Sequence, residues 1–290
     1  MVKIFDGKKV AGEIAKKLTK EIFSLPHTPT LAIIQVGDRP DSNTYVRHKK
    51  SFGEKIGAKV EHILFPNSIS EKEVILKIHA LNRSPHIHGI IVQIPLPHHL
   101  NKDEIISEID PKKDVDGLTT LNQGLMFQEK TCGFVPATPK GVLTLLKRYK
   151  VPLKGKRALV IGRSLLVGKP LAMLLLGEDA TVTIAHRYTK NLHALCKEND
   201  IIVSAVGSPE FLGKRSFRKG QYVIDIGTNA VKGKKIVEEM TITKHKLVGD
   251  VKFDEVSKIV AMISPVPGGV GPMTVATLFE NLIEAAKIAK

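Results

Sequence analysis

The sequence has no tryptophan, only four tyrosines and only two cysteines among its 290 residues. Cys132 and Cys196 stand far apart, without a CxxC spacing or a set of histidines that would complete a zinc site. We therefore expect free thiols in a reducing compartment and no metal. No apolar run is long enough to span a bilayer, and no secretion signal opens the chain. These absences predict a cytoplasmic protein without disulfides or membrane spans.

Negative charge is in short supply, since 44 lysine and arginine residues against 29 acidic ones give a formal net charge of +15. The basic residues are spread along the chain, and no nucleic-acid-binding module can be identified. A polyanionic small molecule is therefore the expected partner, with no nucleic acid and no membrane. The alternative is a basic nucleic-acid-binding protein without catalysis, which would bind DNA in a salt-dependent way and would not bind a dinucleotide.

Apolar runs of strand length alternate with helical patterns along the whole chain, which is typical of parallel sheets with crossover helices. The first half predicts strands at 31–36, 60–64 and 89–94, with helices near 8–23, 42–56, 70–82 and 101–109. The second half predicts strands at 158–161, 181–185, 201–205, 222–226 and 259–263, with helices at 140–149 and from 274 to the end.

A stretch containing proline and glycine, residues 133–139, interrupts this alternation and marks the expected domain junction. The prediction is an α/β protein of two domains with a cleft between them. Residues 1–139, together with the last helix 274–290, would form an α/β substrate domain. Residues 140–273 would form a Rossmann-like, doubly wound parallel sheet.

A glycine turn follows the predicted strand 158–161. It reads Gly162-Arg163-Ser164 and reaches a second glycine, Gly168, just before a helical run. A tight turn leading into a helix N-terminus offers unpaired N–H groups to a pyrophosphate, although the GxSxxxG spacing differs from the usual fingerprint. Arg163 and Ser164 could contact phosphates, or they could be ordinary helix-capping residues.

Basic residues stand at the end of the next strand, where a fold specific for NAD would normally place an acidic residue on the ribose hydroxyls. His186 and Arg187 occupy this point. A cation can pair with a 2′-phosphate, so NADP is the expected cofactor. The alternative is that Arg187 is a solvated loop charge.

A lysine interrupts the apolar stripe of the helix predicted over 42–56. Tyr45, Lys49, Phe52 and Ile56 share one face, and a spacing of four residues sets Tyr45 and Lys49 one above the other. Burying a lysine is costly unless its amine has a task, so both side chains are candidates for contact with one substrate. The alternative is a lysine that extends its amine to solvent from the edge of a core.

Two further segments place polar side chains where α/β sheets bind ligands. Gln93 follows the fully apolar strand that begins at Gly89, so its amide stands at the carboxyl end of a buried strand. There the amide could form a hydrogen bond with an amine and hold it in place. Asp114 and Asp116 flank a valine ahead of Gly117, and one of these carboxylates could accept hydrogen bonds from a substrate amino group. Ordinary turn residues are the alternative in both places.

Taken together, these segments resemble the bifunctional methylenetetrahydrofolate dehydrogenase/methenyltetrahydrofolate cyclohydrolase family in its short bacterial form. The matching blocks span nearly the whole chain in order: Tyr45-x-x-x-Lys49, 89–97, 113–117, 138–141, 162–168 and 265–274, the last reading Pro-Val-Pro-Gly-Gly-Val-Gly-Pro-Met-Thr. The final block is long and unusual enough to make chance agreement implausible.

The resemblance implies that hydride moves from 5,10-methylenetetrahydrofolate to NADP and that the methenyl product is hydrolysed to 10-formyltetrahydrofolate. It implies that Lys49 is the general acid/base, tuned by Gln93, that Tyr45 packs against the folate and that Asp116 holds the pterin. The family loop implies further substrate contacts from Val266, Pro267, Gly268 and Gly269. Gly162, Arg163 and Ser164 would bind the cofactor, with Arg187 at the 2′-phosphate and Thr228 near the nicotinamide.

The family commonly has isoleucine or valine where Thr228 stands, which leaves a backbone contact as the expectation there. The resemblance also implies a homodimer, and the basic surplus fits a folate with a polyanionic glutamate tail. A rival interpretation, an NADP dehydrogenase for a shikimate-like or amino acid substrate, offers no explanation for the 265–274 loop.

Overall fold

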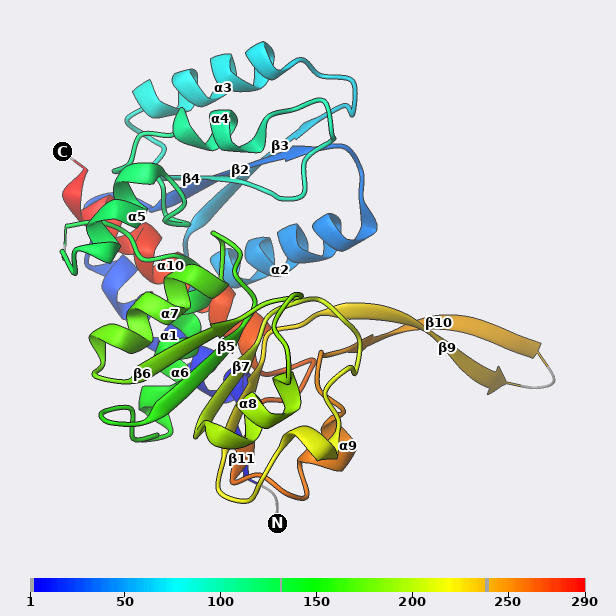
Figure 1. Ribbon diagram of the computed structural model, residues 1–290. Helices are drawn as coiled ribbons and strands as arrows, with labels where there is room; N and C mark the ends of the chain where they lie inside the picture. The colour runs from blue at the N-terminus through cyan, green and yellow to red at the C-terminus, as the bar shows by residue number, and fades with distance from the viewer. Residues whose placement is uncertain (1–2, 131, 238–239, 290) are drawn as a thin grey trace. The chain divides into compact units, whose positions relative to one another are not determined.

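A computed structural model of the chain describes residues 3–130, 132–237 and 240–289 (Figure 1). The chain divides into two compact units. Unit 1 contains Met1–Val10 and Thr138–Thr274, and unit 2 contains Ala11–Ala137 and Val275–Lys290. The first ten residues were placed with the substrate domain from sequence. They lie in unit 1 because β1 (Lys3–Ile4) pairs in parallel with β11 (Met262–Ile263).

Unit 2 is built on a three-stranded parallel sheet in the order β3-β2-β4, formed by Lys59–Phe65, Thr30–Val36 and Gly89–Val92. All seven residues of β2 are buried, as expected for a central parallel strand covered on both faces. Helices α3 (Glu71–Arg83) and α4 (Lys102–Ser107) cover one face, and α2 (Pro40–Ile56) covers the other (Figure 1).

Close packing on the α2 face depends on a glycine. A Cβ built at Gly53 would lie 2.6 Å from a methyl group of Val60 and 3.1 Å from the ring of Phe279. Phe279 belongs to the last helix, α10 (Val270–Ile288), and its ring centroid lies 5.3 Å from that of Phe52. The absence of a side chain at Gly53 therefore lets α2 approach both β3 and α10.

Unit 1 contains a six-stranded parallel sheet in the order β1-β11-β8-β7-β5-β6. Its strands are β5 (Arg157–Ile161), β6 (Thr181–Ala185), β7 (Ile201–Ser204) and β8 (Tyr222–Asp225), in addition to β1 and β11. Counted from β5, the first five strands follow the doubly wound order 2-1-3-4-5, which has a topological switch point between β5 and β7. The prediction of an α/β protein with a doubly wound parallel sheet is confirmed.

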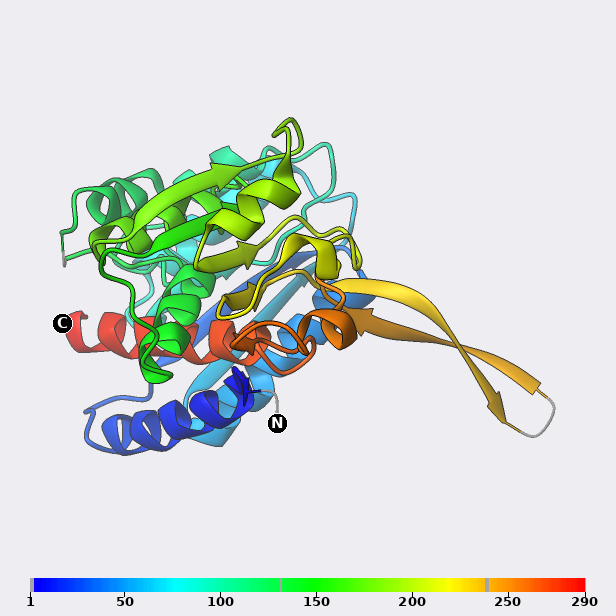
Figure 2. The same cartoon turned by 60° about the horizontal axis from the view of Figure 1, so that its bottom comes forward.

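The remaining helices and one ribbon complete the fold (Figure 2). The helices begin with α1 (Gly7–Phe23), and the others are α5 (Thr120–Phe127), α6 (Ala137–Arg148), α7 (Gly168–Gly177), α8 (Leu192–Glu198), η1 (Lys214–Ser216) and α9 (Phe253–Val256). Strands β9 (Asn229–Val237) and β10 (Met240–Val248) form a two-stranded antiparallel ribbon that extends away from the sheet of unit 1. The sequence analysis did not predict this ribbon, because its lysine-rich strands lack the expected apolar alternation.

Over the described parts of the chain, no helix combines the length and apolar character needed to cross a membrane.

Candidate functional sites

Helix α2 carries the first candidate site. Pro40 stands in its first turn, where a proline costs no hydrogen bond, and Gly57 ends it in the left-handed conformation with φ 87°. Within these limits Tyr45 and Lys49 lie one turn apart on the same face. Tyr45 is 37% exposed, whereas Lys49 is only 8% exposed. The amine of Lys49 is thus the part of this pair that is withdrawn from water.

The Lys49 amine is held by a hydrogen bond. Its Nζ donates to Oε1 of Gln93 at 3.0 Å. Burial lowers the pKa of Lys49 below its ordinary value of 10.5, and the negative charge of Asp116 offsets part of that effect. An amide oxygen accepts a hydrogen bond from the ammonium and also from the neutral amine. Gln93 therefore holds Lys49 in place in either protonation state.

Gln93 lies at the switch point of the unit 2 sheet, just beyond β4, and is 9% exposed. Its backbone N–H donates to the carbonyl of Ile34 at 2.8 Å, so it continues the ladder between β2 and β4. Its side-chain Nε2 donates to the carbonyl of Ile94 at 3.0 Å. This second bond fixes the amide so that its oxygen faces Lys49.

The two aspartates of the 113–117 segment have different tasks. The buried carboxylate of Asp114 accepts the N–H groups of Leu118 at 3.1 Å and Thr119 at 2.8 Å, and Nδ2 of Asn122 at 2.9 Å. It therefore holds the turn that leads into α5. Asp116 is free of these bonds and interacts electrostatically with Lys49.

The pKa of Asp116 is raised, first because protein atoms crowd its carboxyl group and further because Asp114 is nearby. The charge of Lys49 and a hydrogen bond from the Ala137 backbone oppose this shift. Although the residue is partly accessible to solvent, this crowding disfavours the ionised form of its carboxyl group. Burial therefore shifts the pKa of Lys49 and the pKa of Asp116 toward each other.

Asn281 of α10 supports this segment and was not singled out from sequence. Its Nδ2 donates to the carbonyl of Val115 at 2.8 Å and to that of Val135 at 2.9 Å. The signal that could have found it is an amide within the apolar last helix, because a fully buried amide needs backbone partners.

In unit 1, the glycine turn lies at the switch point between β5 and β7. Gly162 has φ 127°, and a Cβ there would lie 2.5 Å from the carbonyl oxygen of Ala205. A Cβ at Gly168 would collide with the backbone of Gly162. Both positions therefore require glycine, and the turn leaves its backbone close to the start of α7.

Ser164 lies ahead of this helix and binds backbone N–H groups at its start. Its Oγ accepts the N–H groups of Val167 at 3.2 Å and Gly168 at 3.4 Å. The hydroxyl can still donate its own proton outward. Arg163 beside it is exposed, so its guanidinium is available at the mouth of the turn.

Arg187 and Thr228 follow β6 and β8 at the same, carboxyl edge of the sheet. Arg187 is exposed, donates to the hydroxyl of Tyr188 at 2.6 Å and has its guanidinium 4.7 Å from the centre of that ring. Thr228 is exposed, and its hydroxyl donates to the carbonyl of Ile226 at 3.4 Å. Both residues therefore stand where a dinucleotide bound at the glycine turn would pass.

The loop of residues 265–269 follows β11 at this edge. Gly268 has φ 110° and accepts the N–H of Lys8 at 3.1 Å, while Gly269 donates to the carbonyl of Pro265 at 2.9 Å. Val266 lines a cavity of about 250 Å³ together with Asp225 and other residues of unit 1. Pro267 lies between Val266 and Gly268 in this compact loop.

Two buried aspartates, Asp225 and Asp250, were missed by the sequence analysis. Burial raises the pKa of Asp225 to about 7 in spite of three backbone N–H donors. The rule that identified Gln93 could have found Asp225, since it is a polar residue at the carboxyl end of an apolar strand.

Among residues 3–130, 132–237 and 240–289, no cluster of three or more histidine, cysteine, aspartate or glutamate side chains could hold a metal ion. Both cysteines are free thiols, with Cys132 exposed and Cys196 buried.

A glycine turn at the switch point of a doubly wound sheet, together with a second α/β unit that holds a buried amine, defines a dinucleotide-dependent enzyme of two units. Two family models match the chain. The catalytic domain of tetrahydrofolate dehydrogenase/cyclohydrolase matches residues 5–116, and the NAD(P)-binding domain matches residues 136–290.

The chain is 48% identical over 289 residues to the bifunctional protein FolD of Ehrlichia ruminantium strain Gardel, covering 98% of this chain and 93% of that protein. It is 39% identical to the Campylobacter jejuni enzyme FolD, with a TM-score of 0.91 over 99% of both chains. The Trypanosoma brucei enzyme, solved with NADP cofactor and inhibitor, is 37% identical with a TM-score of 0.92, covering 98% of this chain and 97% of that one.

The chain belongs to the tetrahydrofolate dehydrogenase/cyclohydrolase family. It is a bifunctional enzyme, a methylenetetrahydrofolate dehydrogenase and a methenyltetrahydrofolate cyclohydrolase. This result confirms the resemblance and rejects both the shikimate-like and the nucleic-acid-binding interpretations.

Proposed function

We propose that Lys49 is the proton-transfer group of the cyclohydrolase reaction and that unit 1 binds NADP for the dehydrogenase reaction. The first proposal rests on the buried Lys49 amine, which forms a hydrogen bond with Gln93 at 3.0 Å and interacts electrostatically with Asp116. A lowered pKa leaves a larger share of this lysine neutral, as a base must be.

In the hydrolysis, water attacks the methenyl carbon and Lys49 takes a proton from that water. The same proton can pass to the ring nitrogen as its bond to the carbon breaks, while the remaining hydroxyl proton goes to solvent. This leaves 10-formyltetrahydrofolate. Gln93 keeps the amine aimed throughout, Asp116 holds the pterin and Tyr45 packs against the folate. The family resemblance adds further substrate contacts from Val266, Pro267, Gly268 and Gly269.

The glycine turn fits a dinucleotide, because Gly162 and Gly168 let the backbone close tightly at the switch point, directly before the N-terminus of α7. Arg163 and Ser164 bind the phosphates, Arg187 pairs with the 2′-phosphate, and the backbone of Thr228 lies near the nicotinamide. NADP is the hydride acceptor when bound. The NADP complex of the Trypanosoma brucei enzyme supports this choice of cofactor.

The substrates are tetrahydrofolate derivatives, including those with polyglutamate tails, which suit the +15 charge of the chain. The enzyme acts as a homodimer in the cytoplasm, in keeping with the family resemblance.

The test is an absorbance assay of the purified chain with 5,10-methylenetetrahydrofolate and NADP, repeated with NAD. We expect reduced cofactor to accumulate faster with NADP, and the methenyl intermediate to form and then decay. Reduction of cofactor without methenyl decay would refute the cyclohydrolase assignment. A preference for NAD would refute the role of Arg187.

A further inference from the structure

Two buried aspartates lie at the carboxyl edge of the unit 1 sheet and are not used by the roles above. Asp225 ends β8 and Asp250 follows β10, and their exposed fractions are 3% and 0%. Each carboxylate occupies the place of a missing side chain. A Cβ at Gly227 would collide with the Asp250 carboxylate, and a Cβ at Gly249 would collide with that of Asp225. The two aspartates and two glycines are therefore interlocked.

Asp250 gathers donors from two separate segments. Its Oδ2 accepts the hydroxyl of Ser204 and the N–H of Val206, both at 2.9 Å. Its Oδ1 accepts the N–H of Ser208 at 2.9 Å and Nδ2 of Asn229 at 3.2 Å. A single carboxylate thus fixes the loop that follows β7 and the start of β9.

The loop that follows β7 borders the glycine turn. Because β7 and β5 are neighbours at the switch point, the loops that follow them form the two sides of the crevice where such sheets bind ligands. The carbonyl oxygen of Ala205 is the atom that a Cβ at Gly162 would meet first. A shift of residues 205–208 would therefore change the space available at Gly162.

Asp225, for its part, holds the backbone at Asp250. It accepts the N–H groups of Asp250 at 3.0 Å, of Val251 at 2.8 Å and of Gly227 at 3.0 Å. The last of these bonds fixes the turn immediately before Thr228. The pair thus connects the loop that follows β7 with the turn that follows β8.

We propose that Asp250, seated by Asp225, is a positioning residue for the dinucleotide, and that it keeps residues 205–208 and the turn at Thr228 in the geometry that binds NADP. This inference rests on the proposed function of unit 1. It assigns no contact between Asp250 and the cofactor.

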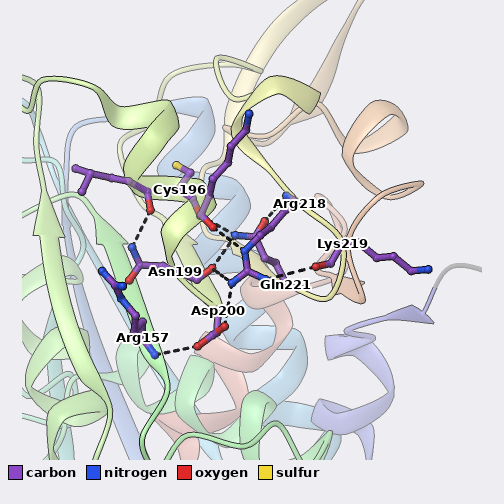
Figure 3. Close-up of polar contacts among 9 residues, drawn as sticks. Arg157, Cys196, Asn199, Asp200, Arg218, Lys219 and Gln221 are labelled. Atoms are coloured by element: carbon purple, nitrogen blue, oxygen red, sulfur yellow. Dashed lines mark hydrogen bonds and ion pairs between the residues drawn. The ribbon is translucent and has the colours of Figure 1, made fainter.

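The opposite, amino edge of the same sheet provides the matched comparison (Figure 3). There Asp200 accepts the backbone N–H of Arg157 at 3.2 Å and the guanidinium of Arg218 at 3.0 Å. Nearby, Gln221 donates to the carbonyls of Cys196 and Asn199. This network also ties strand ends together, but it lies at the edge where such folds do not bind ligands.

The experiment compares Asp250→Asn with Asp200→Asn in the full chain. An asparagine at 250 has one acceptor oxygen, and its NH₂ group would face two of the present donors. We expect NADP, followed by fluorescence titration, to bind about tenfold more weakly, equivalent to ~1.4 kcal/mol. Hydrolysis of methenyltetrahydrofolate, which needs no dinucleotide, should be unchanged. Asp200→Asn should lower the Tm and leave NADP binding unchanged.

Wild-type affinity for NADP in folded Asp250→Asn would overturn the positioning role, and so would an equal loss of NADP binding and hydrolysis. If Asp250→Asn does not fold, Asn229→Ala removes one donor and keeps the charge. It should weaken NADP binding by a smaller factor, and an unchanged affinity would again overturn the role. A wild-type protein that fails to bind NADP would overturn the proposed cofactor site as well, which distinguishes the two failures.

Discussion

The sheet of unit 2 has the same strand order as three neighbouring strands of the unit 1 sheet, but the two units use their switch points differently. In unit 2 the order β3-β2-β4 places the amide of Gln93 at the switch point, where it holds the amine of Lys49. In unit 1 the order β6-β5-β7 places Gly162 there, and the backbone itself forms the turn. The same topology therefore gives a side-chain site in one unit and a backbone site in the other.

The charged side chains at the two sites differ in their exposure to solvent. Lys49 is buried, so its surroundings control whether it carries a proton. Arg187 is exposed, so its charge is screened by water and salt. The first site therefore suits chemistry that needs a variable charge, and the second suits recognition of an anion.

The largest effect should come from Lys49→Met. Without its amine, the cyclohydrolase rate should fall by about 10²- to 10⁴-fold, the usual contribution of a positioned proton-transfer group. The measurement is the decay of methenyltetrahydrofolate absorbance. Lys55→Met, an exposed position on the same helix, is the control and should retain full activity. A folded Lys49→Met enzyme with normal hydrolysis would show that the buried amine is structural.

Arg187→Ala should reduce the preference for NADP over NAD by about ten- to a hundredfold, because a hydrogen bond to a charged group contributes about 1.5–3 kcal/mol. The ratio of kcat/KM for the two cofactors is the measurement. Lys190→Ala, exposed in the same loop, is the matched control. An unchanged ratio would mean that Arg187 is only a solvated charge. The proposed contrast between a buried lysine and an exposed, anion-binding arginine would then fail for the arginine.

The pH dependence of hydrolysis should show the smallest change. The role proposed for Lys49 needs the neutral amine, so the rate should rise with pH through a pKa below the ordinary 10.5. The Asp116 charge raises that pKa, so Asp116→Asn should move the rising limb to lower pH. The measurement is the pH–rate profile of both enzymes, and a shift to higher pH would contradict the assigned pairing.

The same pKa has a consequence for stability. The folded state binds the Lys49 proton less tightly than the unfolded chain, so stability from this group is present above pH 10.5 and is lost as the pH falls toward the folded pKa. Lys49→Met should remove this pH dependence of the free energy of unfolding, which denaturation curves recorded at a series of alkaline pH values would measure.

Sequence reasoning located the strands well, because buried parallel strands are continuous apolar runs bounded by polar turns. The strand predicted at 181–185 is observed over the same residues, and that at 158–161 begins one residue earlier. Lys49 and Gln93 were each identified as a polar residue in an apolar context, and the structure brings them together.

Other features could not be predicted because they depend on contacts between segments far apart in sequence. Asp114 and Asp116 look equivalent in the sequence, and only the donors around Asp114 show which of the two supports the turn. The bonds between Asp250 and the loop after β7 span more than 40 positions. The start of α10 at Val270 was expected at residue 274, because the glycines of the preceding loop concealed it.

The amide of Asn281 fastens the loop that carries Asp116, although 166 positions separate it from Val115. The position of Asp116 therefore depends on α10 as well as on its own turn, because Asn281 bonds the carbonyl of the residue just before it. The surroundings of the Lys49 amine are thus completed by a helix encoded far from both Lys49 and Gln93.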